Sequence, residues 1–174
     1  MKYFTGVGSR KTSQNILDLM RIMAHIFETK GFILRSGGAD GADSAFESGI
    51  TNPANKQIYY ANQATPEAME IASRFHPVWN KYRMDGSPIV SDYAKKLHGR
   101  NAFQVLGFNL NEPSDLLVCW TPDGCTQHIG RSIQTGGTGT AISIAEAYGV
   151  KVANLQRPDH YQQAVDWVKR NYSK

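Results

Sequence analysis

Three glycine-rich stretches of the 174-residue chain have the composition of loops that bind phosphate. They are "GVGSRKTS" at residues 6–13, "SGGADGAD" at 36–43 and "TGGTGTA" at 135–141. Glycine lets a ligand approach the main chain, because no Cβ stands in the way. Free N–H groups at the start of a following helix, together with the helix dipole, favour an anion. Tight strand-to-helix turns also use glycine for structural reasons, but three such turns together favour a phosphate-bearing ligand.

Established nucleotide-loop motifs do not match these stretches. No Gly-Lys-Ser/Thr follows the glycines at the spacing of a Walker A loop. No G-x-G-x-x-G with a downstream acid for the ribose is present either, which disfavours an ordinary dehydrogenase. We predict no cofactor.

Charged and aromatic side chains near the three stretches are candidates for ligand contacts. Arg10 and Arg100 can bind phosphate through charge-assisted hydrogen bonds. A solvated surface position for Arg10 and a structural ion pair for Arg100 are the alternatives. Asp40 and Asp43 suit ribose hydroxyls, or equally the first turn of a helix. Trp120 lies at the end of a strand, where it can stack on a base.

The predicted ligand-binding set combines the turn residues with polar side chains expected at the same edge of the sheet. It comprises Gly8, Ser9, Arg10, Ser36, Gly37, Gly38, Asp40, Asp43, Arg100, Asn101, Trp120, Thr121, Gly136, Gly137, Thr138, Gly139 and Thr140. Trp79 and Tyr82 lie in the aromatic segment 76–90, and their roles as adenine wall, dimer contact or core stay open. A zinc site at Cys119, Cys125 and His128 would be one ligand short, so we predict no metal.

The composition indicates a soluble globular domain. Hydrophobic residues make up 41% of the chain and charged residues 20%, and the net charge is +4. This modest charge favours an anionic partner, but no basic run or stripe favours nucleic acid. The sequence has no signal peptide and no apolar run of membrane-spanning length, so we expect a cytoplasmic protein without a membrane partner.

Apolar strands alternate with amphipathic helices along the chain. Strands are predicted at residues 2–9, 32–38, 56–61, 115–121 and 150–155. Helices are predicted at 16–27, from about 41, from 66, at 91–107, from the third glycine stretch to 148, and at 161–172. Uninterrupted apolar strands are typical of a sheet buried on both faces. The sequence therefore predicts an α/β Rossmann-like three-layer sandwich with a mainly parallel sheet, as one domain over residues 1–174.

Two sets of motifs resemble the SLOG superfamily of Rossmann-like proteins. "GSRKTS" and "SGGADGADSAFESG" resemble its DprA branch, and "LHGRNAF…SDLLVCWTPDG…TGGTGTAISIAEAYGVKV" resembles its LOG branch of phosphoribohydrolases. Together the motifs span residues 3–155. The resemblance implies a pocket for a nucleotide or an ADP-ribose-like or cyclic derivative. Stand-alone proteins of this kind are common in bacteria and phages, and we expect a homo-oligomer.

The sequence departs from the LOG pattern at the residues that carry its chemistry. The catalytic glutamate position is Ser143, and the lysine of the first motif is Asn101. A serine hydroxyl cannot supply the negative charge that stabilises an oxocarbenium ion. Arg100 and Glu146 would be the catalytic residues if the protein is an enzyme, with Glu146 one helical turn beyond the family position. About a dozen residues are also inserted after Trp120, where they can act as a flap.

The sequence is therefore compatible with three functions. The first is a nucleotide-binding sensor or sequestering protein, which the missing glutamate favours. The second is a nucleoside 5′-monophosphate phosphoribohydrolase. The third is a DprA-like binder of single-stranded DNA, which the small net charge disfavours.

Overall fold

Five parallel strands form one sheet. The computed structural model describes residues 1–172, so the last two residues of the predicted domain, 173–174, lie outside the described part. The strand order is β3-β2-β1-β4-β5. The strands are β1 Lys2–Gly6, β2 Phe32–Ser36, β3 Lys56–Ile58, β4 Leu116–Cys119 and β5 Lys151–Asn154. Every neighbouring pair in this order is parallel.

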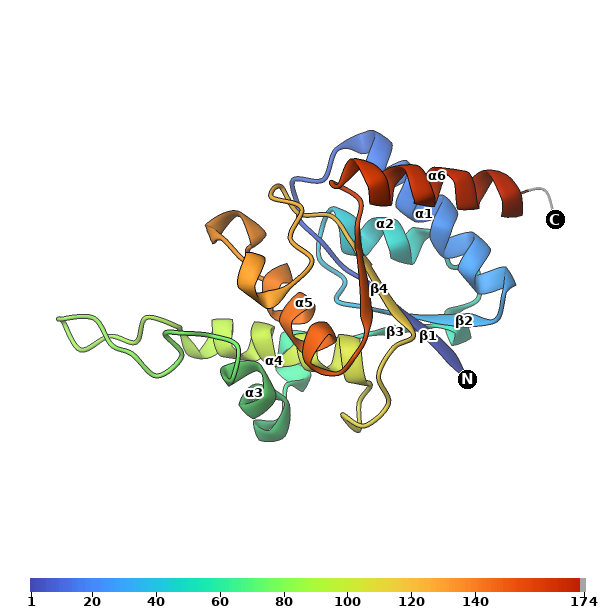
Figure 1. Cartoon of the computed structure of the whole chain (residues 1–174). Coiled ribbons are helices and arrows are strands. Elements are labelled where there is room, and N and C mark those ends of the chain that lie inside the picture. The colour runs from blue at the N-terminus through green and yellow to red at the C-terminus, as the bar shows by residue number, and fades with distance from the viewer. Residues whose placement is uncertain (173–174) are drawn as a thin grey trace.

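Helices cover both faces of this sheet (Figure 1). One face packs against α1 Gln14–Thr29, α2 Ala42–Ser48 and α6 Pro158–Asn171. The other face packs against α4 Asp92–Leu106 and α5 Thr138–Ala147, and α3 Pro66–Ser73 packs on α4. The predicted Rossmann-like three-layer α/β sandwich is confirmed.

Each face of the sheet has its own apolar core. On the side of α1, Phe4 of β1 stacks on Phe27 with ring centroids 4.6 Å apart, and Phe46 of α2 is fully buried beside them. On the side of α4, Phe103 and Leu117 are fully buried in the second cluster. Burial on both faces explains why β4, LLVC, reads as an uninterrupted apolar run, whereas β2 carries the buried Arg35.

Several element boundaries depart from the prediction by up to three residues, and β1, β2 and β4 end earlier than predicted, at Gly6, Ser36 and Cys119. Strand β3 ends at Ile58, because Tyr60 already caps the 3₁₀ turn η2 Ala61–Gln63. Helix α5 ends before Tyr148, and the side chain of Tyr148 is 38% exposed rather than buried. Three further 3₁₀ turns are η1 Pro53–Asn55, η3 His128–Gly130 and η4 Ile133–Thr135.

Residues 76–90 form an arm between α3 and α4 that extends away from the rest of the domain (Figure 1). The base of the arm is anchored by Trp79, which is buried and lies edge-on to His98 of α4 at a centroid distance of 6.1 Å. Toward the tip, Tyr82 forms an isolated antiparallel bridge, and the side chains of Tyr82 and Met84 are exposed. Trp79 is therefore a buried side chain, whereas Tyr82 does not belong to the core.

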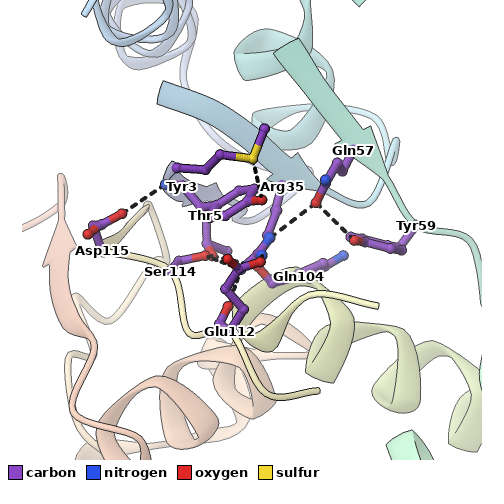
Figure 2. A network of polar contacts seen from close by, with 10 residues as sticks. Tyr3, Thr5, Arg35, Gln57, Tyr59, Gln104, Glu112, Ser114 and Asp115 are labelled. Atoms are coloured by element: carbon purple, nitrogen blue, oxygen red, sulfur yellow. Dashed lines mark hydrogen bonds and ion pairs between the residues drawn. The ribbon is translucent and has the colours of Figure 1, made fainter. Parts of the chain in front are cut away.

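A buried arginine fastens the loop at residues 107–115 to the sheet (Figure 2). Arg35 of β2 is 1% exposed, and its Nη1 donates to the carbonyl oxygen of Glu112 at 2.6 Å. Its Nε donates to Gln57 Oε1 at 3.2 Å, and the guanidinium lies 3.7 Å from the centroid of the Tyr3 ring. Burial lowers the pKa of Arg35, and the hydrogen bonds and the aromatic face partly offset the loss of solvation.

We expect Arg35→Ala to lower the free energy of unfolding by about 3 kcal/mol, because it leaves a cavity and unsatisfied buried acceptors. Urea denaturation monitored by circular dichroism measures the change. The matched control is Glu112→Gln, since the Glu112 side chain is 57% exposed. That control is expected to cost less than about 1 kcal/mol. Equal losses in the two variants would contradict a role for the buried guanidinium.

Candidate functional site

A cavity of about 640 Å³ lies at the carboxyl ends of β1 and β4. The strand order reverses between these two strands, and ligands of open α/β sheets bind at such a switch point. The turn after β1, the start of α2, one face of α4 and the segment 133–138 form its walls. Those predicted residues that line the cavity are Gly8, Ser9, Arg10, Asp43, Arg100, Asn101, Gly136, Gly137 and Thr138.

Asp43 is the buried carboxylate of this cavity. It lies in the first turn of α2 and is 3% exposed. Burial raises the pKa of Asp43 to about 6, although the charge of Arg100 and hydrogen bonds from the N–H groups of Ala39, Gly8 and Gly37 lower it in part. One carboxylate thus joins the turns after β1 and β2 to the start of α2.

Arg100 faces Asp43 from α4 without a close ion pair. Its Nη1 donates to the carbonyl oxygen of Gly37 at 3.1 Å, and its buried Nε has no partner. Within residues 1–172 no carboxylate oxygen lies within 4.0 Å of the guanidinium nitrogens. The predicted alternative, a structural ion pair with an aspartate, is therefore not formed. The guanidinium lines the cavity with hydrogen-bonding capacity to spare.

The turn before α5 presents free amides to the cavity. Asn101 Nδ2 donates to the carbonyl oxygen of Gly137 at 3.1 Å and holds this turn against α4. The N–H groups of Gly137 and Thr138 make no hydrogen bond within the described chain. A Cβ added at Gly136 or Gly137 would meet no atom within 4 Å. This turn is therefore open where a ligand can approach its N–H groups.

Other glycines of the three stretches are required by the protein's own packing. A Cβ at Gly139 would collide with the guanidinium of Arg131, and one at Gly37 would collide with Gln104 and Asp43. Gly136 has a φ of +62°, which favours glycine in any case. Close approach of protein atoms thus accounts for the glycines at positions 37 and 139. At Gly137 no protein atom is close, and the space beside it is open.

The remaining predicted residues do not line the cavity: Ser36, Gly37, Gly38, Asp40, Trp120, Thr121, Gly139 and Thr140. Side chains at the ends of β2 and β4 form hydrogen bonds to neighbouring segments at the edge of the sheet instead. Ser36 Oγ donates to the carbonyl oxygen of Gly6 at 2.6 Å, and Trp120 Nε1 donates to Gln156 Oε1 at 3.0 Å. Asp40 is exposed to solvent.

One face of α4 contributes lining residues that the sequence prediction missed. Leu97 and Gln104 line the cavity together with Arg100 and Asn101. Their spacing of three, four and seven residues is that of one helical face, so the periodicity of the helix could have identified them. Lys11, next to the predicted Arg10, also lines the cavity.

The predicted insertion at residues 121–135, called the flap below, is anchored by Asp123. The Asp123 carboxylate accepts hydrogen bonds from the hydroxyls of Thr121 at 2.8 Å, Ser132 at 2.7 Å and Thr135. Burial raises the pKa of Asp123, but these bonds outweigh that effect and the pKa is lowered. Four side chains of the insertion therefore hold its two ends together. The sequence prediction included a flap but not this anchor.

Ser143 and Glu146 do not face the cavity. Ser143 Oγ lies 2.7 Å from His128 Nδ1 and accepts a hydrogen bond from Arg131 Nη1 at 3.2 Å. Glu146 accepts a hydrogen bond from the backbone N–H of His128 at 2.6 Å. Flap residues therefore contact both side chains that stand at the positions considered for a catalytic carboxylate.

Cys119 and Cys125 are buried free thiols, and burial raises the pKa of Cys119. Within residues 1–172 no group of three His, Cys, Asp or Glu side chains is close enough to hold a metal ion. No described helix is both long and apolar enough to cross a membrane.

Comparison of the chain with family models, curated proteins and solved structures gave no significant match. The resemblance to the SLOG superfamily therefore stays a prediction that depends on the motifs quoted above.

We expect the stability of the wild-type protein relative to Asp43→Asn to fall as the pH rises from 4 to 7. The pKa of Asp43 is raised from 3.8 to about 6 in the folded state, so the folded state binds more protons in this range. The stability that Asp43 contributes through this raised pKa is fully present below pH 3.8 and is lost as the pH rises through about 6. The predicted loss is about 3 kcal/mol. Urea denaturation of both proteins across this range measures it, and parallel stability profiles would contradict it.

Proposed function

We propose that the protein binds a nucleotide or a nucleotide derivative in the cavity at the switch point, as a sensor or a sequestering protein. The phosphate of this ligand would accept hydrogen bonds from the N–H groups of Gly137 and Thr138, at the start of α5. A cavity of about 640 Å³ is in the size range of small-molecule sites.

The observation that carries this proposal is the charge around the open turn. Among the described residues, the cationic side chains of Arg10, Lys11 and Arg100 line the cavity against the single carboxylate of Asp43. A phosphate in the cavity would offset this excess positive charge and accept charge-assisted hydrogen bonds from the guanidinium of Arg100.

Binding is favoured over phosphoribohydrolase activity by the surroundings of Ser143. A glutamate at this position would lie beside Arg131 and His128 of the flap, where it would form an ion pair rather than face a ligand in the cavity. The carboxylate of Glu146 already accepts a hydrogen bond from the backbone N–H of His128. Homo-oligomer formation stays a prediction.

Gly137→Val is expected to abolish nucleotide binding without unfolding the protein. A Cβ at this position meets no protein atom within 4 Å, so we expect the added side chain to take up open space beside the free amides. Isothermal titration calorimetry with AMP and with ADP-ribose measures the affinity, and thermal denaturation checks the fold. Gly137→Ala is the graded control, with an intermediate loss expected. Unchanged affinity in Gly137→Val for a ligand that the wild type binds would contradict the assignment of this turn.

Arg100→Ala is expected to weaken the same binding by about 1.5–3 kcal/mol, which is tenfold or more in the dissociation constant. The loss follows from removal of charge-assisted hydrogen bonds to phosphate. Arg10→Ala is expected to act in the same direction. Arg170→Ala, an exposed arginine of α6 on the opposite face of the sheet, is the control and should leave affinity unchanged. If Arg100→Ala destabilises the fold but binds normally, its role is structural.

A further inference from the structure

A second hollow of about 870 Å³ adjoins the cavity. It lies between residues 74–77 at the end of α3 and residues 128–133 of the flap. His98, Ile133, Gly136 and Gly137 line both spaces, so the hollow, called the basic groove below, continues from the cavity past the turn before α5.

Arg131 gives the basic groove a positive charge that no carboxylate offsets. Its Nη1 donates to the carbonyl oxygen of Phe75 at 2.8 Å and to Ser143 Oγ at 3.2 Å. Within the described residues no carboxylate oxygen lies within 4.0 Å of its guanidinium nitrogens. Burial lowers the pKa of Arg131, so keeping this charge costs free energy. A bound anion would reduce that cost.

Three imidazoles complete the lining of the basic groove. His76 lies 4.9 Å from His98 between ring centroids, and its buried Nδ1 has no hydrogen-bond partner. His128 Nδ1 lies 2.7 Å from Ser143 Oγ. In the tautomer whose Nδ1 accepts from the Ser143 hydroxyl, the ring proton lies on Nε2, and His128 can donate it to a group in the groove.

Charge repulsion among these groups is consistent with a space that accepts an anion. Burial, together with the charges of His76, Arg131 and Arg100, lowers the pKa of His98 to about 4. Burial and Arg131 also lower the pKa of His76. No carboxylate lines the groove within residues 1–172 to relieve this repulsion.

We propose that the basic groove is a second anion subsite, which takes a second phosphoryl group of a ligand whose first phosphate lies at the amides of Gly137 and Thr138. The preferred ligand is then a nucleotide with two phosphoryl groups, such as a nucleoside diphosphate linked to a sugar. This inference rests on the proposed function, because the first phosphate defines the position of the second.

Inorganic phosphate tests the two subsites separately and does not require the base to be known. The full chain, labelled with ¹⁵N and ¹³C, is titrated with phosphate at pH 7 and constant ionic strength. The Gly137 amide reports on the cavity, and the rings of His76 and His128 report on the groove. In the wild type we expect both sets of resonances to shift and saturate.

Arg131→Gln is expected to weaken the phosphate affinity seen at the histidine rings at least tenfold, and the affinity seen at the Gly137 amide less than threefold. Should Arg131→Gln fail to fold, His76→Phe serves instead, because it keeps the ring shape and removes an unpartnered nitrogen. In His76→Phe we expect the phosphate affinity measured at the His128 ring to fall several-fold. Arg170→Gln is the matched control for charge, since Arg170 is exposed on α6 and does not line the groove.

Histidine rings that do not respond, while the Gly137 amide does, would overturn the second subsite and leave the proposed function intact. Absence of any response at Gly137 would overturn both. Equal losses in Arg131→Gln and Arg170→Gln would also overturn the subsite, because they would show a general effect of net charge.

Discussion

The burial of the Asp43 carboxylate is the constraint on which the arrangement of the cavity depends. Its oxygens are buried and accept hydrogen bonds from N–H groups in the turns after β1 and β2. Both strand ends and the start of α2 therefore share one acceptor. These bonds and Arg100 only partly offset the loss of solvation, which leaves the carboxyl with a pKa of about 6. Costly burial of this kind is common where a binding site needs fixed charges. Arg100 therefore faces the cavity opposite a charge that is already fixed in position.

The flap adds a second layer of organisation on the other side of the turn before α5. Asp123 fixes its two ends, and Arg131 fills the space that the missing side chain of Gly139 leaves. The same arginine donates a hydrogen bond to Ser143, the position at which the resemblance to the LOG branch would place a catalytic carboxylate. The turn at Gly137 is thus open to a cavity on one side and to a groove on the other. This geometry favours a ligand with more than one anionic group.

The sequence predicted the fold well because its signals are local. Apolar runs mark the strands, and Thr65 with Pro66 marks the start of α3, where the Thr65 hydroxyl accepts from a backbone N–H. The site was predicted less completely, because the direction of a side chain at a strand end depends on neighbours far away in the chain. Trp120 bonds to Gln156 instead of facing the ligand edge. The role of Arg131 was likewise invisible, since it depends on how the flap folds back onto α5.

Native mass spectrometry of the protein freshly purified from cells tests most directly whether the cavity holds a nucleotide. The proposed function predicts a bound species that denaturation releases as a phosphorus-containing compound with nucleobase absorbance, and that Gly137→Val no longer retains. The contradicting result is a bare chain in the wild type that also gains no adduct after incubation with AMP or ADP-ribose.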